Sequence, residues 1–303
     1  MKKIGYYLVF YCLLVPLSLL PMWFLYGISN ILSPILQYLL KYRVRVVEIN
    51  LKKSFPNKTE EELKTIKKLF YNHLSDIFME ALKMLTISKR NLIKRYSCQN
   101  KEVLDKYYKN NQSLIFVSSH HNNWEYMVLS LGMQFPFQGV GVGKRMSNKV
   151  FGDLMHKKRT RYGTSVCYSD NVREVIEKKR KEKTPTIFML LADQSPNDKH
   201  KCYWTEFLNQ DTPAIFGPEN LAKKENFPVI YYRVSKVKRG YYSFELIPLE
   251  DKPQETKYGE ITLRYLNELE KTINEAPPYW LWSHKRWKHK RPENIYQDKF
   301  INH

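Results

Sequence analysis

The feature that most constrains this chain is its N-terminal run from Ile4 to Leu40, which contains no charged residue. A helix needs about 20 apolar residues to cross a bilayer, so the part from Ile4 to Leu25 is long enough for one crossing. Pro16 and Pro21 argue against a straight helix, although membrane helices tolerate proline better than soluble helices do. The run is too long for a cleaved signal peptide, and no small-residue cleavage site closes it. We therefore expect residues 1–40 to anchor the protein to a membrane, rather than to form a buried hairpin of a soluble protein.

The second half of the run, from Tyr26 to Leu40, is less apolar than the first, because it carries glycine, serine, asparagine and glutamine. This composition is typical of an interfacial or re-entrant helix, and whether the segment spans the membrane or lies on it stays open. Basic residues flank the whole run on both sides and specify its orientation only weakly. No repeat or low-complexity linker follows, so residues 41–303 are expected to form one catalytic domain.

The chain is strongly basic, with 50 Lys and Arg against 30 Asp and Glu, and a formal net charge of +20. Such an excess fits nucleic acid, anionic lipid or an acidic carrier protein equally well. The membrane anchor favours lipid and carrier protein over nucleic acid. Basic and aromatic residues also alternate from Trp280 to Arg291, and behind an anchor this pattern is better explained by contact with lipid headgroups.

Periodicity after residue 56 predicts an α/β domain. Thr59 and the glutamates that follow it form a capping box that begins a helix, whose apolar residues recur at helical spacing from Leu63 to Leu85. Short β-type runs then alternate with helical stretches, which indicates a largely parallel sheet with its chemistry at the carboxyl ends of the strands. The expected strands are 114–117, 139–142, 166–168, 186–191 and 229–234, and the expected helices are 124–131, 150–161 and 172–180.

A histidine pair and a glutamate follow the first of these strands, in the sequence Ser-Ser-His120-His121-Asn-Asn-Trp-Glu125. His120 in a strand-to-helix turn can hydrogen-bond a carboxylate one helical turn later, which would fix the imidazole tautomer and stabilise the protonated ring. Acyl transfer from a thioester to an alcohol needs such a base, since an alcohol is a poor nucleophile until it is deprotonated. His121 would face Glu125 better within one continuous helix. On the pair alone, a capping His120 and a solvated Glu125 are the simpler interpretation.

No metal site and no cofactor are expected. The cysteines are scattered, without a C-x-x-C spacing, and reduced thiols are the plain interpretation. His284, His289 and Cys202 have no carboxylate or thiolate at ligand spacing, so we interpret the two histidines as solvated residues of the C-terminal tail.

Five blocks of the sequence resemble, in order and spacing, the late acyltransferases of lipid A biosynthesis within the lysophospholipid acyltransferase superfamily. His120 to Glu125, after a strand, resembles the H-x4-[DE] motif of the superfamily, and its Asn-Trp-Glu ending is similar to the narrower family. In one block the family commonly has Asp-x-Asp-x-Gly, whereas this chain has Asp193-Gln-Ser-Pro. The other blocks are RVRVVEINLKKSFP at 43–56, Arg145 with Asn148 and RTRYG at 159–163, LADQ at 191–194, and YWLWSHKRW at 279–287.

The resemblance implies a glycerol-phosphate acyltransferase-like mixed sheet flanked by helices. It also implies His120 as general base and Glu125 as the partner that orients it. Arg159 matches the functional arginine of the family, with Arg161 as a close competitor, and either would clamp a phosphate of donor or acceptor. Asp193 would position Arg159 or the acceptor. A solvated helix face remains the alternative for Arg159, because most charge runs are solvated.

Arg145 and Asn123 lie inside the resembling blocks and are expected to contact substrate as well. The resemblance implies O-acyl transfer from an acyl thioester, on acyl carrier protein or CoA, to a hydroxyl of a membrane glycolipid such as a lipid A precursor. The cell inner membrane is the expected location, with the catalytic domain facing the cytoplasm. The basic surface suits an acidic carrier protein and phosphorylated headgroups alike. The alternatives are another lipid acceptor, such as a lysophospholipid or an aminoacyl lipid, and a non-enzymatic, membrane-tethered protein that binds lipid or nucleic acid.

Overall fold

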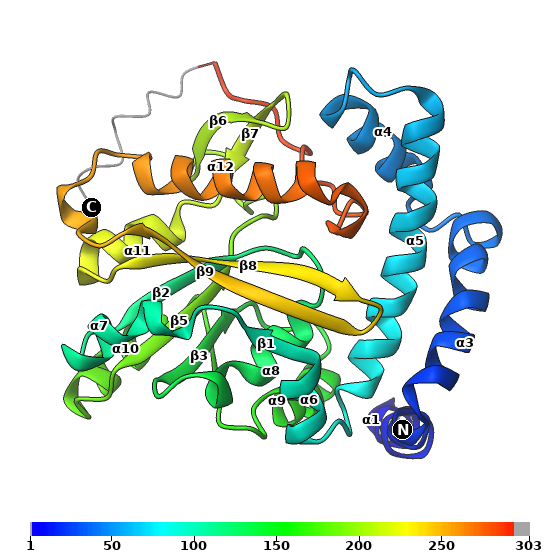
Figure 1. Ribbon diagram of the computed structural model, residues 1–303, viewed down its shortest axis with the longest axis horizontal. Coiled ribbons are helices and arrows are strands. Elements are labelled where there is room, and N and C mark those ends of the chain that lie inside the picture. The colour runs from blue at the N-terminus through cyan, green and yellow to red at the C-terminus, as the bar shows by residue number, and fades with distance from the viewer. Residues whose placement is uncertain (1, 294–303) are drawn as a thin grey trace.

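A seven-stranded sheet lies at the centre of the computed structural model, which describes residues 2–293 (Figure 1). The strand order is β1-β9-β8-β2-β5-β3-β4, and all neighbours run parallel except the hairpin of β8 and β9. The sheet is therefore mixed, with a parallel centre. Its strands are β1 (Tyr96–Cys98), β2 (Leu114–Ser118), β3 (Gln138–Gly143), β4 (Ser165–Tyr168), β5 (Thr186–Leu191), β8 (Val229–Lys238) and β9 (Tyr241–Glu250).

The regular elements predicted from periodicity are confirmed. The five expected strands correspond to β2, β3, β4, β5 and β8, and the expected helices to α8 (Trp124–Gln134), α9 (Lys149–Arg159) and α10 (Val172–Lys181). Helix α5 (Glu60–Lys83) begins at the expected capping box, in which Thr59 and Glu62 each accept a hydrogen bond from the backbone of the other. Periodicity did not predict β1, β9 or the small antiparallel pair β6 (Tyr203–Phe207) and β7 (Gln210–Ala214).

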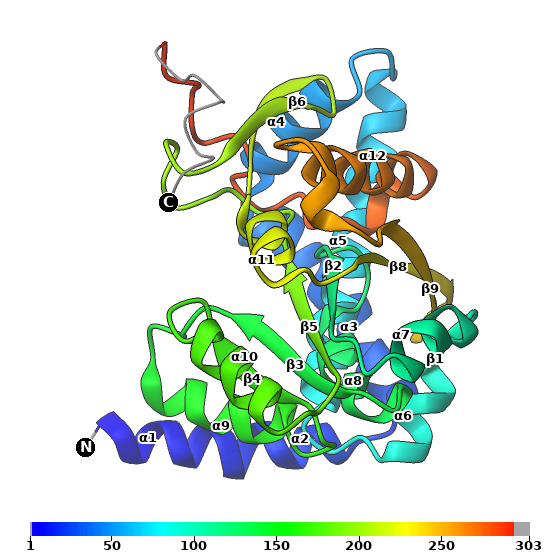
Figure 2. The ribbon, with the colours of Figure 1, turned by 90° about the vertical axis from the view of Figure 1, so that its left-hand side faces the viewer.

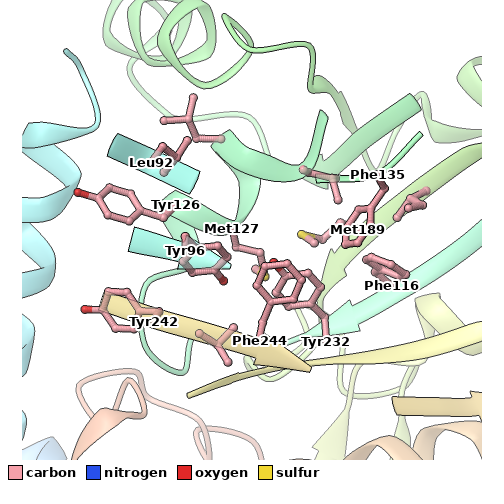
Figure 3. Packing of buried hydrophobic residues seen from close by; sticks show 14 of the residues in the cluster. Leu92, Tyr96, Phe116, Tyr126, Met127, Phe135, Met189, Tyr232, Tyr242 and Phe244 are labelled. Atoms are coloured by element: carbon pink, nitrogen blue, oxygen red, sulfur yellow. The ribbon is translucent and has the colours of Figure 1, made fainter. Parts of the chain in front are cut away.

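Side chains that alternate along the strands fill a core on each face of the sheet. On β2, Phe116 packs into one core, and Ile115 and Val117 pack into the other. Figure 3 shows the first core, where Phe116 lies among aromatic residues such as Tyr232 and Phe244. This core is covered by α6 (Lys89–Arg95), α7 (Asp105–Lys109), α8 and α9, and the second by α4 (Val44–Ser54), α11 (Gly217–Glu225) and α12 (Glu260–Glu275), while α5 contacts both.

The N-terminal segment bends sharply at Pro21. One helical stretch covers Ile4–Leu19 and the next Met22–Leu39, with an angle of 113° between them. Proline lacks an N–H and forces the preceding residue out of the helical region, and Leu20 accordingly has ψ 147°. The expectation of one helix from Ile4 to Leu25 is therefore wrong. Among residues 2–293 no single helix is long and apolar enough to cross a bilayer, although the bent pair together has the required length and composition.

The two arms of this segment lie against different parts of the domain. The first arm, α1 (Lys2–Leu8), a π-helical turn (Val9–Leu14) and α2 (Val15–Leu19), runs along α9 (Figure 2). The second arm, α3 (Met22–Pro34) followed by a π-helical turn (Ile35–Leu39), packs beside α5 (Figure 1).

Helix α3 buries Ser29 and Ser33 together with Leu25 against the protein and exposes large apolar side chains outward. Ser29 donates to Asp76 of α5 at 2.7 Å, and Ser33 donates to Asn72 of α5 at 2.6 Å. The outward side chain of Trp23 is 74% exposed. A helix on the surface of a soluble protein has the opposite polarity. Ser29 and Ser33, two of the polar residues that lowered the apolar character of Tyr26–Leu40, therefore face α5.

Candidate active site

The register of the central strands brings His120 and Asp193 together. β2 and β5 are parallel neighbours, and Ser118 at the end of β2 pairs with Leu191 at the end of β5. His120 and Asp193 each lie two residues beyond these paired ends, so the two side chains meet at the carboxyl edge of the sheet. Parallel sheets gather their functional groups at this edge.

Asp193 holds both the ring and the backbone of His120. One carboxylate oxygen lies 2.8 Å from Nδ1 of His120, and the other accepts the His120 backbone N–H at 2.9 Å. The indole N–H of Trp280 also donates to this second oxygen, at 2.9 Å. Burial would raise the pKa of Asp193, but the charge and hydrogen bonds of His120, together with Trp280, outweigh burial and lower it. An ionised Asp193 accepts the Nδ1 proton, which leaves Nε2 of His120 as the basic nitrogen.

His120 lines a pocket of about 230 Å³ that has apolar walls. The side chain of His120 is 16% exposed, and its ring packs edge-on against Trp124 at 5.1 Å between ring centroids. The amide of Gln194 lies 3.2 Å from Nε2 and can donate a hydrogen bond to it. The apolar walls consist of Val128, Val142, Met146, Val166, Met189 and Leu191, and the polar lining includes Glu125, Lys144, His156, Arg159 and Tyr168.

His121 is a buried structural residue. Its Nε2 donates to the carbonyl of Ala276 at 3.2 Å, and its Nδ1 accepts from the amide of Asn122 at 2.8 Å. Burial lowers the pKa of His121 to about 4, so the ring is neutral at pH 7. Asn122, which follows the two histidines, has φ +62°, a left-handed conformation that asparagine tolerates. The structure thus places His120, and not His121, at the pocket.

Glu125 pairs with Arg159 and not with His120. Nε and Nη2 of Arg159 donate to the two carboxylate oxygens of Glu125, at 2.8 and 2.5 Å. The expected hydrogen bond between His120 and Glu125 is therefore corrected, because Asp193 occupies the Nδ1 side of the ring. The expectation that Asp193 positions Arg159 is corrected in the same way, because Glu125 holds that guanidinium. His120, Glu125 and Arg159 line the pocket, whereas Asp193 lies behind His120 and does not line it.

The other expected site residues lie farther from the pocket. Arg161 donates to the backbone carbonyls of Ile87 and Lys158, so Arg159 is the arginine that lines the pocket. Arg145 pairs with Asp170 at 3.2 Å and lies over the ring of Tyr168, at the outer rim.

Asn123 is fully buried and serves as the N-cap of α8, accepting the backbone N–H of Tyr126 at 2.8 Å. It therefore acts on the helix that carries Glu125 and does not line the pocket.

The C-terminal aromatic-basic block belongs largely to the core of the site. Trp280 and Trp282 are buried, and so is Arg286, whose pKa burial lowers to about 10. His284 is partly buried and accepts the backbone N–H of Ser195 at 3.1 Å. The expectations of headgroup contact for these buried residues and of a solvated His284 are therefore wrong. In residues 2–293, no group of three or more His, Cys, Asp or Glu side chains is arranged to hold a metal ion.

The sequence matches a known protein family over nearly its whole length. The model of a family described as bacterial lipid A biosynthesis acyltransferase matches residues 1–289, which is nearly the whole chain. A search of curated proteins gives no match. The matched range includes the site described above, together with the N-terminal segment and the C-terminal aromatic-basic block. The chain therefore belongs to the bacterial lipid A biosynthesis acyltransferase family.

Proposed function

We propose that the protein transfers a fatty acyl chain from an acyl thioester to a hydroxyl of a membrane glycolipid, with a lipid A precursor as the acceptor. The observation that carries the proposal is that His120, held by Asp193, lines a pocket with apolar walls. Family membership supports acyl transfer to a lipid and favours an enzyme over a non-enzymatic binding protein. A lysophospholipid or an aminoacyl lipid is the alternative acceptor.

His120 acts as general base in this proposal. Its Nε2 takes the proton of the acceptor hydroxyl as the oxygen attacks the thioester carbonyl, and a tetrahedral intermediate forms. The C–S bond then breaks, and the proton on Nε2 passes to the leaving thiolate, which departs as a thiol. Asp193 keeps Nε2 free of its proton before attack and stabilises the imidazolium during the reaction. Gln194 must give up its contact with Nε2 when the acceptor hydroxyl enters.

The Glu125–Arg159 pair orients substrate beside the base. Glu125 engages Nε and Nη2 of Arg159, so Nη1 is not used in this ion pair. A guanidinium suits an oxygen of a phosphate or of the thioester carbonyl, because its donors are fixed in a plane. Glu125 in turn keeps the guanidinium at the pocket wall, where an unpaired cation would be costly to bury.

The pocket itself supports an acyl chain as the transferred group. Val128, Val142 and Met189 on its walls offer no hydrogen bonds to a polar ligand, and His120 lines the same pocket. A thioester whose chain fills this pocket would have its carbonyl beside Nε2. Acyl carrier protein is the proposed carrier, because a net charge of +20 favours an acidic partner. CoA is the alternative.

The proposed location is the cell inner membrane, with the catalytic domain facing the cytoplasm, and the N-terminal segment supports the association with a membrane. Side chains on its outer surface are large and apolar, including Ile4, Leu19 and Ile31, which are 64%, 67% and 65% exposed. Ser29 and Ser33 of α3 are paired with α5. An apolar outer surface around a polar seam is stable where the surrounding medium is lipid.

The test compares the membrane lipids of the host with and without the gene by mass spectrometry. Deletion should remove one acyl chain from one lipid class, the wild-type gene should restore it, and His120→Ala should not. The matched control is Arg161→Lys, because Arg161 lies outside the pocket and should leave the chain in place. Unchanged lipids on deletion, or full restoration by His120→Ala, would overturn the proposal.

A further inference from the structure

A buried carboxylate connects the N-terminal segment to the active-site turn. Glu80 of α5 is fully buried and accepts three hydrogen bonds. Tyr26 of α3 donates to one oxygen at 2.9 Å, and Asn123 and Tyr242 donate to the other at 2.6 and 2.8 Å. Figure 3 shows the hydroxyl of Tyr242 pointing away from the aromatic core, on the side of α5. One side chain therefore joins α3, α5, α8 and β9.

The orientation of the Asn123 amide depends on this carboxylate. The Asn123 nitrogen donates to Glu80, which leaves the amide oxygen to accept the backbone N–H of Tyr126. Without an acceptor at Glu80, nothing prevents a flip of the Asn123 amide that exchanges its oxygen and nitrogen. The amide nitrogen would then face the backbone N–H of Tyr126, which it cannot cap. The first turn of α8 is thereby held by a contact outside the pocket.

The first turn of α8 carries two groups of the site. Trp124 packs against the ring of His120, and Glu125 binds Arg159. Both directly follow Asn123 in the chain, so a loosened N-cap displaces them together. Tyr26, at the other end of the network, belongs to the segment whose outer face is apolar.

We propose that Glu80 is a positioning residue that couples the seating of the N-terminal segment to the geometry of the active-site turn. The proposal rests on the proposed function only for its effect on turnover. When Tyr26 is seated, Glu80 is fixed, Asn123 caps α8, and Trp124 and Glu125 take their places beside His120. When α3 is displaced, for example when the protein leaves its membrane, the cap loosens and transfer slows.

Hydrogen exchange on the full-length protein in lipid nanodiscs tests the coupling without any substrate. Tyr26→Phe removes only the hydroxyl that meets Glu80 and should speed exchange in the peptide that contains Tyr126. Loss of the whole N-cap should speed exchange in this peptide about 2- to 30-fold, and this is the largest increase that we expect. Asn123→Ala, which removes the cap, should show that largest increase. Ser29→Ala is the matched control, because it removes a hydroxyl of α3 that meets Asp76 and not Glu80. Equal effects of Tyr26→Phe and Ser29→Ala at this peptide, or none from either, would overturn the coupling.

Steady-state kinetics distinguishes positioning from a merely structural role. The probe is the dodecanoyl thioester of acyl carrier protein, with a lipid extract of the gene-deleted host as acceptor. Tyr26→Phe should lower kcat several-fold at unchanged KM for the thioester, whereas Ser29→Ala should change neither. Glu80→Gln can still accept from Asn123 and Tyr242 through its one oxygen, so it should retain more turnover than Glu80→Leu.

Unchanged kcat in Tyr26→Phe, or a change in KM alone, would contradict the positioning role. Glu80→Leu can fail to fold, and in that case the comparison of Tyr26→Phe with Ser29→Ala decides. If the wild-type protein transfers no chain, the proposed function fails, while hydrogen exchange still decides the coupling.

Discussion

Replacing Asp193 by asparagine should reverse the tautomer of His120 while keeping the shape of the site. One oxygen of Asp193 accepts two donors, the backbone N–H of His120 and the indole of Trp280, and the other oxygen meets Nδ1 of His120. In the Asp193→Asn variant, the single amide oxygen should take the position of the carboxylate oxygen that accepts both the His120 backbone N–H and the Trp280 indole N–H. The NH2 group of the new side chain then faces Nδ1, which must accept, so the ring proton moves to Nε2. Nε2 would donate into the pocket instead of taking the proton of the acceptor.

The magnitude follows from what this reversal removes. The opposite amide orientation would set the NH2 group against two buried donors, and each unsatisfied donor costs about 1–3 kcal/mol. The reversed tautomer is therefore favoured. In a serine protease the same carboxylate-to-amide change lowers kcat by about 10⁴-fold, and loss of a general base generally costs about 10²–10⁴-fold. We expect a fall in kcat of about 10³–10⁴-fold for Asp193→Asn, with little change in KM for the thioester.

Two measurements check this expectation. Initial rates of acyl addition to lipid, followed by mass spectrometry, give kcat and KM, and nitrogen NMR of labelled histidine reports which ring nitrogen of His120 carries the proton. Melting temperature serves as the control for folding. An Asp193→Asn enzyme that retains the Nδ1-protonated ring, or that stays within tenfold of wild-type kcat, would refute the assignment of Asp193 as the orienting carboxylate.

Four other changes should have distinct effects. Glu125→Gln should lower turnover by loosening Arg159 but leave the tautomer of His120 unchanged by NMR; a reversed tautomer would restore Glu125 as its partner. Gly141→Val should shift the transferred chains toward shorter lengths in lipid mass spectra, because the new side chain enters the pocket beside Val128, and unchanged lengths would place the chain elsewhere. Burial lowers the pKa of His121 from 6.5 to about 4. The neutral ring therefore contributes its full stabilisation above pH 6.5, and the free energy of unfolding falls by about 3 kcal/mol as the pH is lowered from 6.5 to 4. Denaturant titrations of His121→Gln should therefore depend less on pH in this window than those of wild type. Removing residues 1–40 should release the protein from liposomes at high salt, and a truncated protein that stays bound would show that the remaining chain carries its own apolar membrane surface.

Local sequence patterns predicted the elements that are decided locally. The Thr59 capping box, the alternation of strands and helices, and the turn after β2 depend on residues a few positions apart. The same holds for the position of His120 at a strand end. The pairing of β1 with β9 depends on contacts between distant segments, and it was not predicted. The hairpin of β8 and β9 around Gly240 is local in the sequence, and it was not predicted either.

The partner of His120 could not be found from spacing for the same reason. Glu125 lies five residues away in the sequence, whereas Asp193 becomes a neighbour only because β5 lies next to β2 in the sheet. The rule that functional groups meet at the carboxyl ends of parallel strands singled out both strand ends, but it does not give the strand order. Asp193 was therefore predicted as a site residue from the sequence, but its contact with His120 was not predicted, and the predicted contact with Arg159 is wrong.

The two carboxylates are suited to different tasks by their surroundings. Asp193 is 2% exposed and lies behind His120, away from the pocket, where its lowered pKa keeps it ionised as the acceptor of the Nδ1 proton. Glu125 lies on the pocket wall beside Arg159, whose side chain is 28% exposed. If Glu125 instead held His120, Arg159 would be an unpaired cation beside apolar walls. In this arrangement the imidazole of His120 and the guanidinium of Arg159 each have a carboxylate partner. The arrangement requires α8 to begin at the position that Asn123 caps. A substitution at Asn123 would directly disturb the ion pair between Glu125 and Arg159. Asp193 would still hold His120, because strands β2 and β5 position these two residues.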